Sequence, residues 1–302
     1  MAPSADTSPP GDPGPSEGPK STDPAGRSDL DAYPRPSLAV DVAVMSVVPA
    51  AWTTGPDGGR SGSGSDGAGA GRAAGRSGGR SEAGSAALKL AVVLLRRDGA
   101  PHAGQWSLPG SFVHEHERLA DTVRRTLLDK CGITDLSPTQ LQVFDDPKRD
   151  SRGWVVSVAH LAVVASQRLA PLVKSGTDHL CFAAVPDPAP PAVTDASRGV
   201  GPRTAPLAIP GRQRRLPFDH DEIVTLAVAE LRRRYDEHPD PDGLMADRFT
   251  LLELRRLHEA IHGRELQKDT FRRQVIDQLE DLHETSDGTV GRPAALFTVL
   301  NP

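Results

Sequence analysis

The sequence predicts an α+β protein, in which a strand-rich half precedes a mostly helical half. In the first half, runs such as 37–48 and 88–95 place β-branched and other apolar residues at the alternating positions of a strand, and strand-like runs lie on both sides of one predicted helix. In the second half, apolar residues recur at helical spacing, and a strand-like run closes the chain at 295–299.

Stretches rich in Pro, Gly and Ser interrupt this pattern. The chain has 302 residues, of which 29 are Gly and 28 are Pro. Segments of this composition bury too little apolar surface to offset their ordering entropy. We therefore expect a disordered tail at 1–36, a Gly/Ser-rich insertion at 53–86 and a Pro-rich linker at 186–217, with folded domains at 37–185 and 218–302.

The insertion falls between two strand-like runs. We interpret 37–48 and 88–95 as the two strands of one hairpin whose turn is lengthened by the insertion, because the entropy of loop closure grows slowly with length. The alternative is a domain boundary within the insertion. It would leave 37–48 without a strand to pair with.

Composition excludes several classes of protein. The longer apolar runs, such as Leu90–Leu95, are far below the ~18 residues of a membrane span. No apolar segment follows Met1, so we expect no secretory signal. Two cysteines, Cys131 and Cys181, are too few for a disulfide framework or a cysteine-rich zinc site, and a cytoplasmic location is expected. A net charge of -5 means that any contact with nucleic acid depends on a local basic patch.

Capping signals predict the helices of the second half. Asp219–Glu222 has the spacing of a capping box before a helix that reaches about Tyr235. Thr250–Glu253 is a second such box, and its helix is expected to end at Gly263. A third helix is expected at 268–279, burying Phe271, Val275 and Leu279.

Helix, tight turn, second helix with a basic face and hairpin together form the pattern of a winged helix-turn-helix domain. Lys268 and Arg272 are a like-charge pair four residues apart, which phosphate oxygens would stabilise. Arg273 is our candidate for a guanine contact and Arg292 for an adjacent groove. The expected DNA contacts are Lys268, Thr270, Arg272, Arg273, Gln274 and Arg292.

An alternative for this face is solvation without DNA. Asp269, Arg273 and Asp277 have the spacing of intrahelical ion pairs, and residues 250–302 contain seven Lys/Arg against nine Asp/Glu. A net negative charge is unusual for a DNA-binding module. Local patterning alone leaves both possibilities open.

Residues 106–133 resemble the Nudix box. In register with that family's pattern, Ser111 takes the first glycine position and Glu117 the first glutamate position, while Arg125 takes the position of the arginine. Leu127, Gly132 and Ile133 also match. The other acidic positions are occupied by Thr126, Asp129 and Lys130.

These replacements change the chemistry that the resemblance implies. Mg²⁺ requires hard oxygen ligands, and an ammonium group repels it. We therefore expect a degenerate site with no catalytic residue, no bound metal and no cofactor. Residual hydrolysis through Glu117 and Asp129 is the alternative.

A pocket of this kind can still bind a nucleotide, and its arginines and lysine can contact phosphate. The run 144–153 resembles the segment that Nudix proteins acting on ADP-ribose place beside their ligand; alternatively it is a polar loop. The expected effector-binding residues are Ser111, Phe112, Arg125, Lys130, Arg149 and Arg152.

Residues 216–299 resemble the C-terminal part of Nudix-related transcriptional regulators of the NrtR type. The resemblance rests on Leu216–Ile223, Phe249–Leu254, His262–Arg264, Phe271–Arg273 and Gly291–Ala294. It implies a Nudix-like α/β sandwich followed by a winged helix, a homodimer, a double-stranded DNA operator, and repression of genes of NAD metabolism that ADP-ribose or a related nucleotide relieves.

We therefore expect a ligand-responsive repressor rather than an enzyme. One alternative is a Nudix hydrolase that cleaves ADP-ribose-like nucleoside diphosphates, against which Lys130 counts. A second is a protein-protein adaptor, favoured only by the acidic balance of the helical half.

Overall fold

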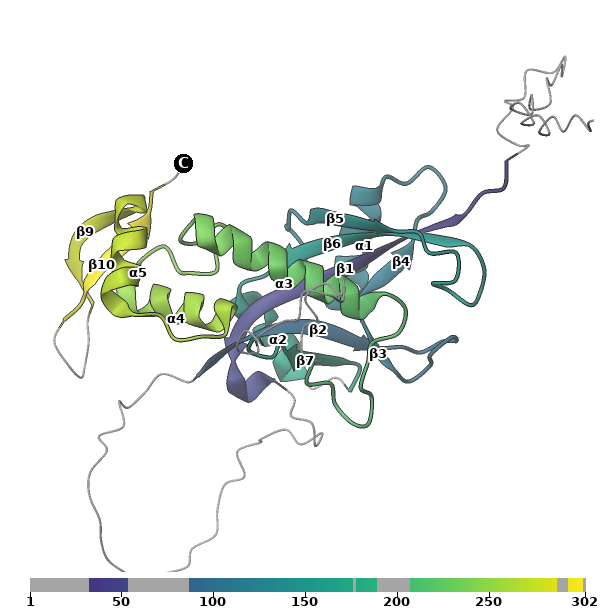
Figure 1. Cartoon of the computed structure of the whole chain (residues 1–302), viewed down its shortest axis with the longest axis horizontal. Helices are drawn as coiled ribbons and strands as arrows, with labels where there is room; N and C mark the ends of the chain where they lie inside the picture. The colour runs from purple at the N-terminus through teal and green to yellow at the C-terminus, as the bar shows by residue number, and fades with distance from the viewer. Residues whose placement is uncertain (1–32, 54–86, 176–177, 189–206, 287–292, 301–302) are drawn as a thin grey trace, which may run out of the picture. The chain divides into compact units, whose positions relative to one another are not determined.

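The computed structural model describes residues 33–53, 87–175, 178–188, 207–286 and 293–300 (Figure 1). The expected tail at 1–36, the insertion at 53–86 and the linker at 186–217 lie mostly outside the described residues. Contacts divide the chain into two units, Met1–Pro36 and Ser37–Pro302. In the second unit, strands and helices intermingle up to residue 184 and helices prevail from residue 220, so the α+β class is confirmed.

A seven-stranded mixed sheet forms the first half (Figure 1). Its central strand, β1 (Ser37–Pro49), runs antiparallel to β2 (Leu88–Arg96) and parallel to β6 (Val155–Val163). Neighbours on both edges and helices on both faces bury β1 over residues 39–48. The other strands are β3 (Trp106–Ser107), β4 (Gly110–Phe112), β5 (Thr139–Phe144) and β7 (Leu180–Ala184).

The predicted hairpin is confirmed. Met45 pairs with Val92 and Pro49 with Leu88 in an antiparallel register. The two strands are therefore neighbours in the sheet, although residues 54–86 between them lie outside the described part of the chain.

Helices pack on both faces of β1. The helices that contact this strand include α1 (Leu119–Cys131), α2 (Ser166–Ser175) and α3 (His220–Glu237). Val42 shares a hydrophobic cluster with Leu127 of α1, whereas Met45 shares the other cluster with Ile223 of α3. The period of two along the strand therefore directs alternate residues to α1 and to α3. Among the described residues, no helix is long and apolar enough to cross a membrane.

The helix ends agree with the sequence at α1 and differ from it at α3. Gly132 ends α1 in the left-handed conformation (φ 61°), as predicted. The prediction of a capping box at the start of α3 was wrong, because the Asp219 side chain accepts no hydrogen bond from the backbone of the helix. Its carboxylate instead contacts Arg149, with Nε 2.5 Å from Oδ2.

The second half ends in a winged helix. Thr250 and Glu253 form both bonds of the predicted capping box at the start of α4. The third helix was predicted one residue too long: the α-helix ends at Val275, a 3-10 helix follows over Ile276–Gln278, and Leu279 pairs with Val299 in a strand. The elements are β8 (Phe249–Thr250), α4 (Leu251–His262), α5 (Lys268–Val275), β9 (Leu279–Thr285) and β10 (Ala295–Val299).

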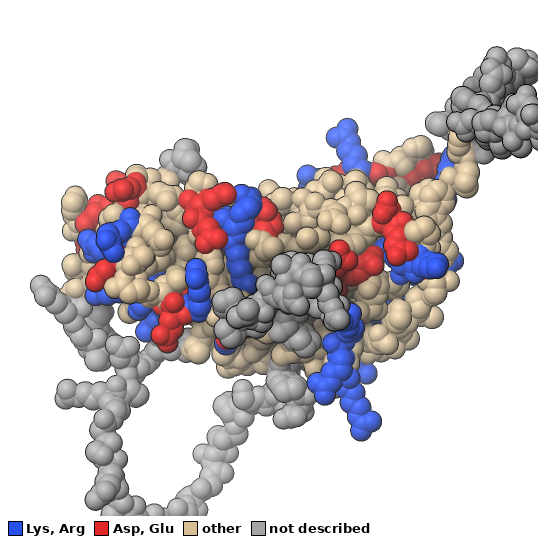
Figure 2. Space-filling view, in the orientation of Figure 1, with Lys and Arg blue, Asp and Glu red and all other residues tan. Residues whose placement is uncertain are grey.

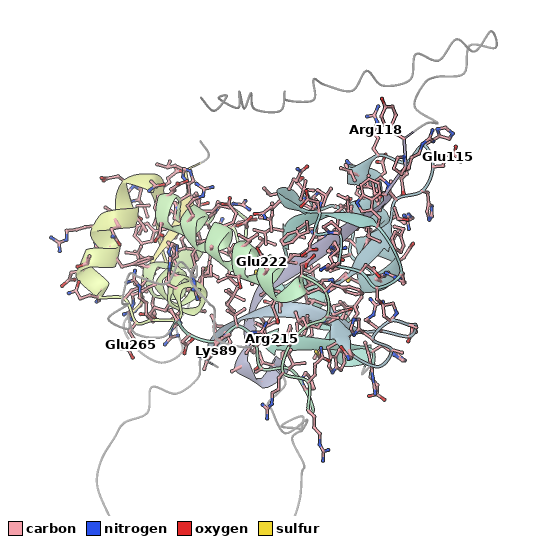
Figure 3. All side chains as sticks on the ribbon, turned by 45° about the vertical axis from the view of Figure 1, so that its right-hand side comes forward. Lys89, Glu115, Arg118, Arg215, Glu222 and Glu265 are labelled. Atoms are coloured by element: carbon pink, nitrogen blue, oxygen red, sulfur yellow. The ribbon has the colours of Figure 1, made fainter. Side chains whose placement is uncertain are left out.

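The turn between α4 and α5 approaches the chain that leaves β7. Gly263 ends α4 with φ 64°, and a Cβ there would lie 2.7 Å from Pro188 Cδ. A side chain would collide at this position, so glycine is required by both conformation and space. Nearby, Lys89, labelled in Figure 3, forms an ion pair with Asp187 at 3.0 Å.

Candidate functional site

The six residues predicted to bind an effector all line one cleft, with a volume of about 710 Å³. They come from three parts of the Nudix-like half. β4 supplies Ser111 and Phe112, α1 supplies Arg125 and Lys130, and the loop between β5 and β6 supplies Arg149 and Arg152. The fold therefore brings together candidates that are up to 41 positions apart in the sequence; their role in binding stays a prediction.

Positive charge prevails among the residues that line the cleft. The cations are Arg96, Arg97, Arg125, Lys130, Arg149 and Arg152, and the carboxylates are Asp41, Asp98, Asp129 and Asp150. A narrow site lined mainly by one sign of charge concentrates ligands of the opposite sign. The cleft thus favours an anion such as a diphosphate.

Glu117, the first acid of the Nudix-like pattern, is engaged by Arg125. The two side chains form a bidentate pair, with Nε–Oε1 and Nη2–Oε2 distances of 2.8 Å. Hydrogen bonding to Arg125, and then to the backbone N–H of His114, holds the pKa of Glu117 well below its usual range. Arg125 also donates to the Phe112 carbonyl at 3.0 Å, so the pair connects α1 to β4.

The two replaced acidic positions of α1 behave differently. Thr126 is buried, its hydroxyl donates to the Thr122 carbonyl at 2.7 Å, and it is not among the residues that line the cleft. Lys130 lines the cleft and donates to the Gly110 carbonyl, and burial lowers its pKa. Among the described residues, no group of three His, Cys, Asp or Glu side chains could hold a metal ion.

Asp41 is the buried centre of the cleft wall. Its Oδ2 accepts from Ser157 Oγ at 2.7 Å and from Arg149 Nη2 at 3.2 Å. Its Oδ1 lies 3.3 Å from His220 Nε2. His220 Nδ1 accepts from the Leu108 N–H at 3.0 Å, which places the ring proton on Nε2, facing Asp41.

Burial alone would raise the pKa of Asp41. The hydrogen bonds of His220 and Ser157 and the charge of Arg149 together hold that pKa well below its usual range. The chain also makes room for this carboxylate at Gly110, where a Cβ would lie 2.3 Å from Asp41 Oδ1. Any larger residue at that position would displace Asp41.

Arg149 has two carboxylate partners already. Its Nε contacts Asp219 and its Nη2 contacts Asp41, and its side chain is only 3% exposed. Arg152 is paired with the buried Asp150 at 2.6 Å but is 43% exposed. Of these two predicted phosphate contacts, Arg152 is therefore the more accessible.

Four further residues that line the cleft were not predicted from the sequence: Arg97, Phe218, Asp41 and His220. Arg97 has no carboxylate within salt-bridge distance in the described part of the chain, and its Cζ lies 5.0 Å from the centre of the Phe218 ring. Asp41 offered a usable signal, because it is the one charged residue in a strand that is otherwise apolar or small. For Arg97 and Phe218, the sequence contains no comparable signal.

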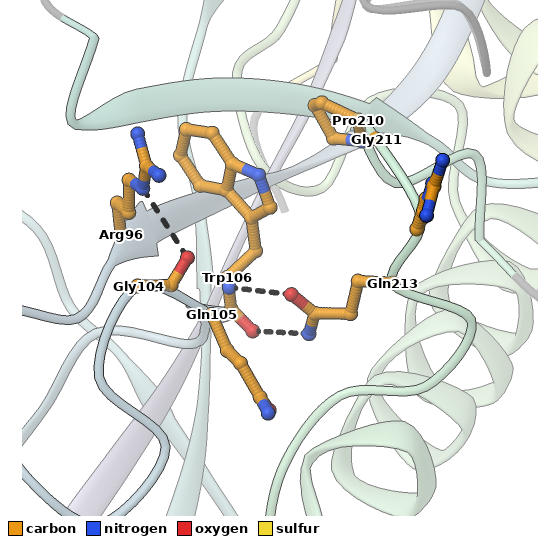
Figure 4. Close-up of a pocket in the computed structure, with 8 residues that line it drawn as sticks. Arg96, Gly104, Gln105, Trp106, Pro210, Gly211 and Gln213 are labelled. Carbon is orange, nitrogen blue, oxygen red and sulfur yellow. Dashed lines mark hydrogen bonds between the residues drawn. The ribbon is translucent and has the colours of Figure 1, made fainter.

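A second hollow, of about 510 Å³, lies beside β3 (Figure 4). Here the Gln213 side chain pairs with the backbone of Trp106: the Trp106 N–H donates to Oε1 at 2.7 Å, and Nε2 donates to the Trp106 carbonyl at 2.8 Å. This contact fastens the segment before α3 to the edge of the sheet.

The predicted DNA contacts on α5 share one exposed face. Lys268, Thr270, Arg272, Arg273 and Gln274 are exposed, whereas Phe271 and Val275 are buried. Arg273 donates to the Asp269 carbonyl at 3.2 Å, and among the described residues it forms no ion pair with Asp269 or Asp277. Figure 2 shows acidic and basic side chains interspersed rather than one basic patch. Arg292 lies outside the described residues.

Comparisons with known proteins match both halves. A family described as the NUDIX domain matches residues 83–200, and the NrtR DNA-binding winged helix domain matches 243–299. The ADPR responsive transcriptional repressor NtrR of Acinetobacter baylyi is 29% identical over 213 residues, 69% of this chain and 75% of that protein. The ADP-ribose pyrophosphatase of Methanocaldococcus jannaschii is 31% identical over 87 residues, 29% of this chain and 49% of that protein.

Solved structures have the same fold. Shewanella oneidensis NrtR, complexed with a 27mer DNA, superposes with a TM-score of 0.57 at 24% identity, covering 87% of this chain and 93% of that one. A MutT/nudix family protein from Enterococcus faecalis gives 0.58 at 21% identity, covering 88% and 87%. The two domains and their order define a Nudix-fold protein that carries a DNA-binding winged helix. These two domains, in this order, are similar to those of the NrtR-type Nudix-related transcriptional regulators, as the resemblance predicted.

Asp41→Asn should lower the free energy of unfolding by about 3 kcal/mol at pH 7, because it breaks a buried charge pair and leaves Arg149 less compensated. A carboxyl whose pKa is lowered by folding stabilises the protein above its unfolded pKa of ~3.9, and this stability is lost as the pH falls through the folded value. The difference between wild type and variant should therefore shrink below about pH 4.

Urea unfolding across a pH series measures this difference. Asp121→Asn is the matched control, because Asp121 forms an exposed pair with Arg124 that should contribute less than about 1 kcal/mol. A difference for Asp41→Asn that stayed constant from neutrality to about pH 3 would contradict the charge network as its source.

Proposed function

We propose that this protein is a repressor whose winged helix binds operator DNA and whose Nudix cleft binds ADP-ribose or a related nucleotide. The observation that carries the proposal is the joining, in one chain, of a cation-lined Nudix cleft to the NrtR-type winged helix, whose α5 exposes Lys268, Arg272 and Arg273. The name of the Acinetobacter relative supports ADP-ribose as effector. We further propose genes of NAD metabolism as its targets.

A homodimer is part of this proposal. Symmetric dimers place two recognition helices on the two half-sites of a palindromic operator. The effector can change repression only if it binds the DNA-competent and the DNA-free arrangements with unequal affinity.

We also propose that the Nudix box of this chain has lost its hydrolytic role. Glu117 is paired with Arg125, Thr126 bonds to its own helix, and Lys130 directs an ammonium group into the cleft. In this arrangement cations of the protein, rather than Mg²⁺, would neutralise the diphosphate of the effector. The similarity to an ADP-ribose pyrophosphatase over 87 residues keeps hydrolysis as the second candidate function.

An electrophoretic mobility shift with the DNA upstream of the protein's own gene tests the proposal. The full-length protein should retard this DNA at moderate salt, and ADP-ribose should change the fraction retarded. No retardation would defeat the repressor function. A phosphate-release assay with ADP-ribose and Mg²⁺ tests the second candidate, and robust turnover would establish a hydrolase.

Arg273→Ala should weaken operator binding by about 1 to 3 kcal/mol and relax the choice of sequence, as expected for an arginine that contacts a base. Arg233→Ala is the control, because Arg233 is exposed on α3 and paired with Glu230 and Glu237. Titration of both variants against operator and scrambled DNA gives the comparison. Equal affinities for wild type and Arg273→Ala would show that Arg273 makes no base contact.

In the absence of divalent cations, Lys130→Glu should weaken ADP-ribose binding about tenfold or more, because the substitution replaces a cation of the cleft by an anion. Added Mg²⁺ should restore part of the affinity in this variant but leave the wild-type affinity unchanged. Calorimetric titrations in EDTA and in Mg²⁺ measure both effects. Lys148→Glu, an exposed position outside the cleft lining, controls for net charge. A wild type that binds only with Mg²⁺ would overturn the proposed role of Lys130.

A further inference from the structure

Three consecutive residues where the chain enters α3 line the effector cleft or contact its wall. Phe218 and His220 line it, and Asp219 contacts the cleft residue Arg149. The sequence places these residues directly before the helical half, yet their side chains complete the wall of a pocket in the Nudix half. The cleft is therefore shared between the sheet and the helix that leads to the winged helix.

Phe218 has a backbone conformation that a bulky residue rarely adopts. Its φ is +55°, in the left-handed region, where a non-glycine residue costs free energy. Such conformations persist only when the surroundings impose them, and they concentrate at ligand sites and switches. At this position, the conformation accompanies a ring that lines the cleft.

The ring of Phe218 is surrounded by cationic groups. The guanidinium of Arg97 lies 5.0 Å from the ring centre, and those of Arg149 and Arg152 lie 6.0 Å from it. His102 meets the ring edge to face at 5.1 Å. An aromatic face beside several guanidiniums fits a ligand that combines a ring with a diphosphate, because bases stack on aromatic side chains and phosphates bind arginine.

The two ends of α3 are fastened to different parts of the protein. Before its start, the Gln213 side chain holds the chain against Trp106 (Figure 4). Toward its other end, Arg232 donates to the Ile261 carbonyl of α4 at 2.9 Å, and the ring of Tyr235 lies 5.3 Å from that of His258. α3 is continuous over its 18 residues, with the first contact before its start and the other two near its end. It is therefore a continuous physical connection between the cleft and α4.

We propose that Phe218 is a stacking contact of the nucleotide effector, and that this contact at the start of α3 transmits effector occupancy to the winged helix. The inference rests on the proposed function and adds to it both a binding residue and a route. A nucleotide that stacks on Phe218 in one position of α3 and not in another binds the two arrangements with unequal affinity. Regulation requires this difference. By linkage, operator DNA must change effector affinity by the same factor by which effector changes DNA affinity.

Phe218→Gly is the diagnostic variant, because it removes the ring and glycine tolerates the positive φ of this position. Phe112→Ala is the matched control: Phe112 also lines the cleft and has Arg152 5.1 Å from its ring, but it belongs to β4 and not to α3. ADP-ribose is the effector probe, and the DNA upstream of the gene is the operator probe. The full-length protein is used throughout, and circular dichroism establishes that each variant is folded. Phe218→Leu replaces the glycine variant if the latter does not fold.

Two quantities are measured for each protein: the dissociation constant for ADP-ribose, and the ratio of DNA affinities with and without saturating ADP-ribose. Both variants should bind ADP-ribose about tenfold more weakly, as expected for a lost stacking contact. At saturation, Phe112→Ala should keep the wild-type ratio of DNA affinities. In Phe218→Gly that ratio should fall toward one.

The failures can be told apart. Unchanged ADP-ribose affinity in Phe218→Gly would overturn the stacking contact. A wild-type ratio of DNA affinities in that variant would overturn the route through α3. Neither result would contradict the repressor function. Loss of the ratio in Phe112→Ala as well would place the coupling in the whole cleft and refute the specific role of Phe218. A wild-type protein whose DNA affinity ignores ADP-ribose would remove the proposed function, and this inference with it.

Discussion

The buried carboxylate of Asp41 is the interaction on which the arrangement of the cleft depends. It joins β6 through Ser157, the loop before β6 through Arg149, and the start of α3 through His220. A buried charge of this kind costs several kcal/mol of desolvation unless partners compensate it, so each partner is held in place by the same requirement. Gly110 belongs to this constraint, because only a residue without Cβ leaves space for the carboxylate.

Electrostatics also distinguish this cleft from the metal site that its fold resembles. A magnesium site gathers carboxylates, whereas Glu117 is neutralised by Arg125 and Lys130 faces the cleft. The cations that line the cleft can contact a diphosphate, whereas Thr126 and Lys130 offer Mg²⁺ no carboxylate ligand. Binding and hydrolysis place different demands on the same pocket. Under the proposed function, the replacement of acids on α1 favours binding over hydrolysis.

α3 belongs to both halves of the molecule. Its buried face completes the core on one side of the sheet, and the same hydrophobic cluster continues into α4 through Leu254 and Leu257. The domain boundary that composition predicts at residue 218 would assign α3 to the second domain. In the structure, α3 shares one hydrophobic cluster with the sheet that it covers. The boundary predicted from sequence stays a prediction, whereas the packing of α3 is a property of the structure.

Several local elements and the resemblance to a family could be predicted from the residues alone. Alternation along 37–48, the capping box at Thr250 and the glycines at 132 and 263 predicted their structures correctly, because these signals act over a few residues. The resemblance to Nudix proteins also identified six residues that line one cleft, which local periodicity could not have done. Edge strand β5 and Pro-containing α2 carry weak periodicity and were missed.

The partners of the charged residues, by contrast, follow from the folded arrangement of the chain. Asp219 has the spacing of a helix cap, but Arg149, 70 positions away, holds its carboxylate. Leu279 follows a helical pattern but pairs with Val299. Phe218, Arg97 and Asp41 meet at the cleft because separate strands, loops and a helix converge there. Burial and long-range ion pairs outweigh local propensity at such points, and they arise only after the chain has folded.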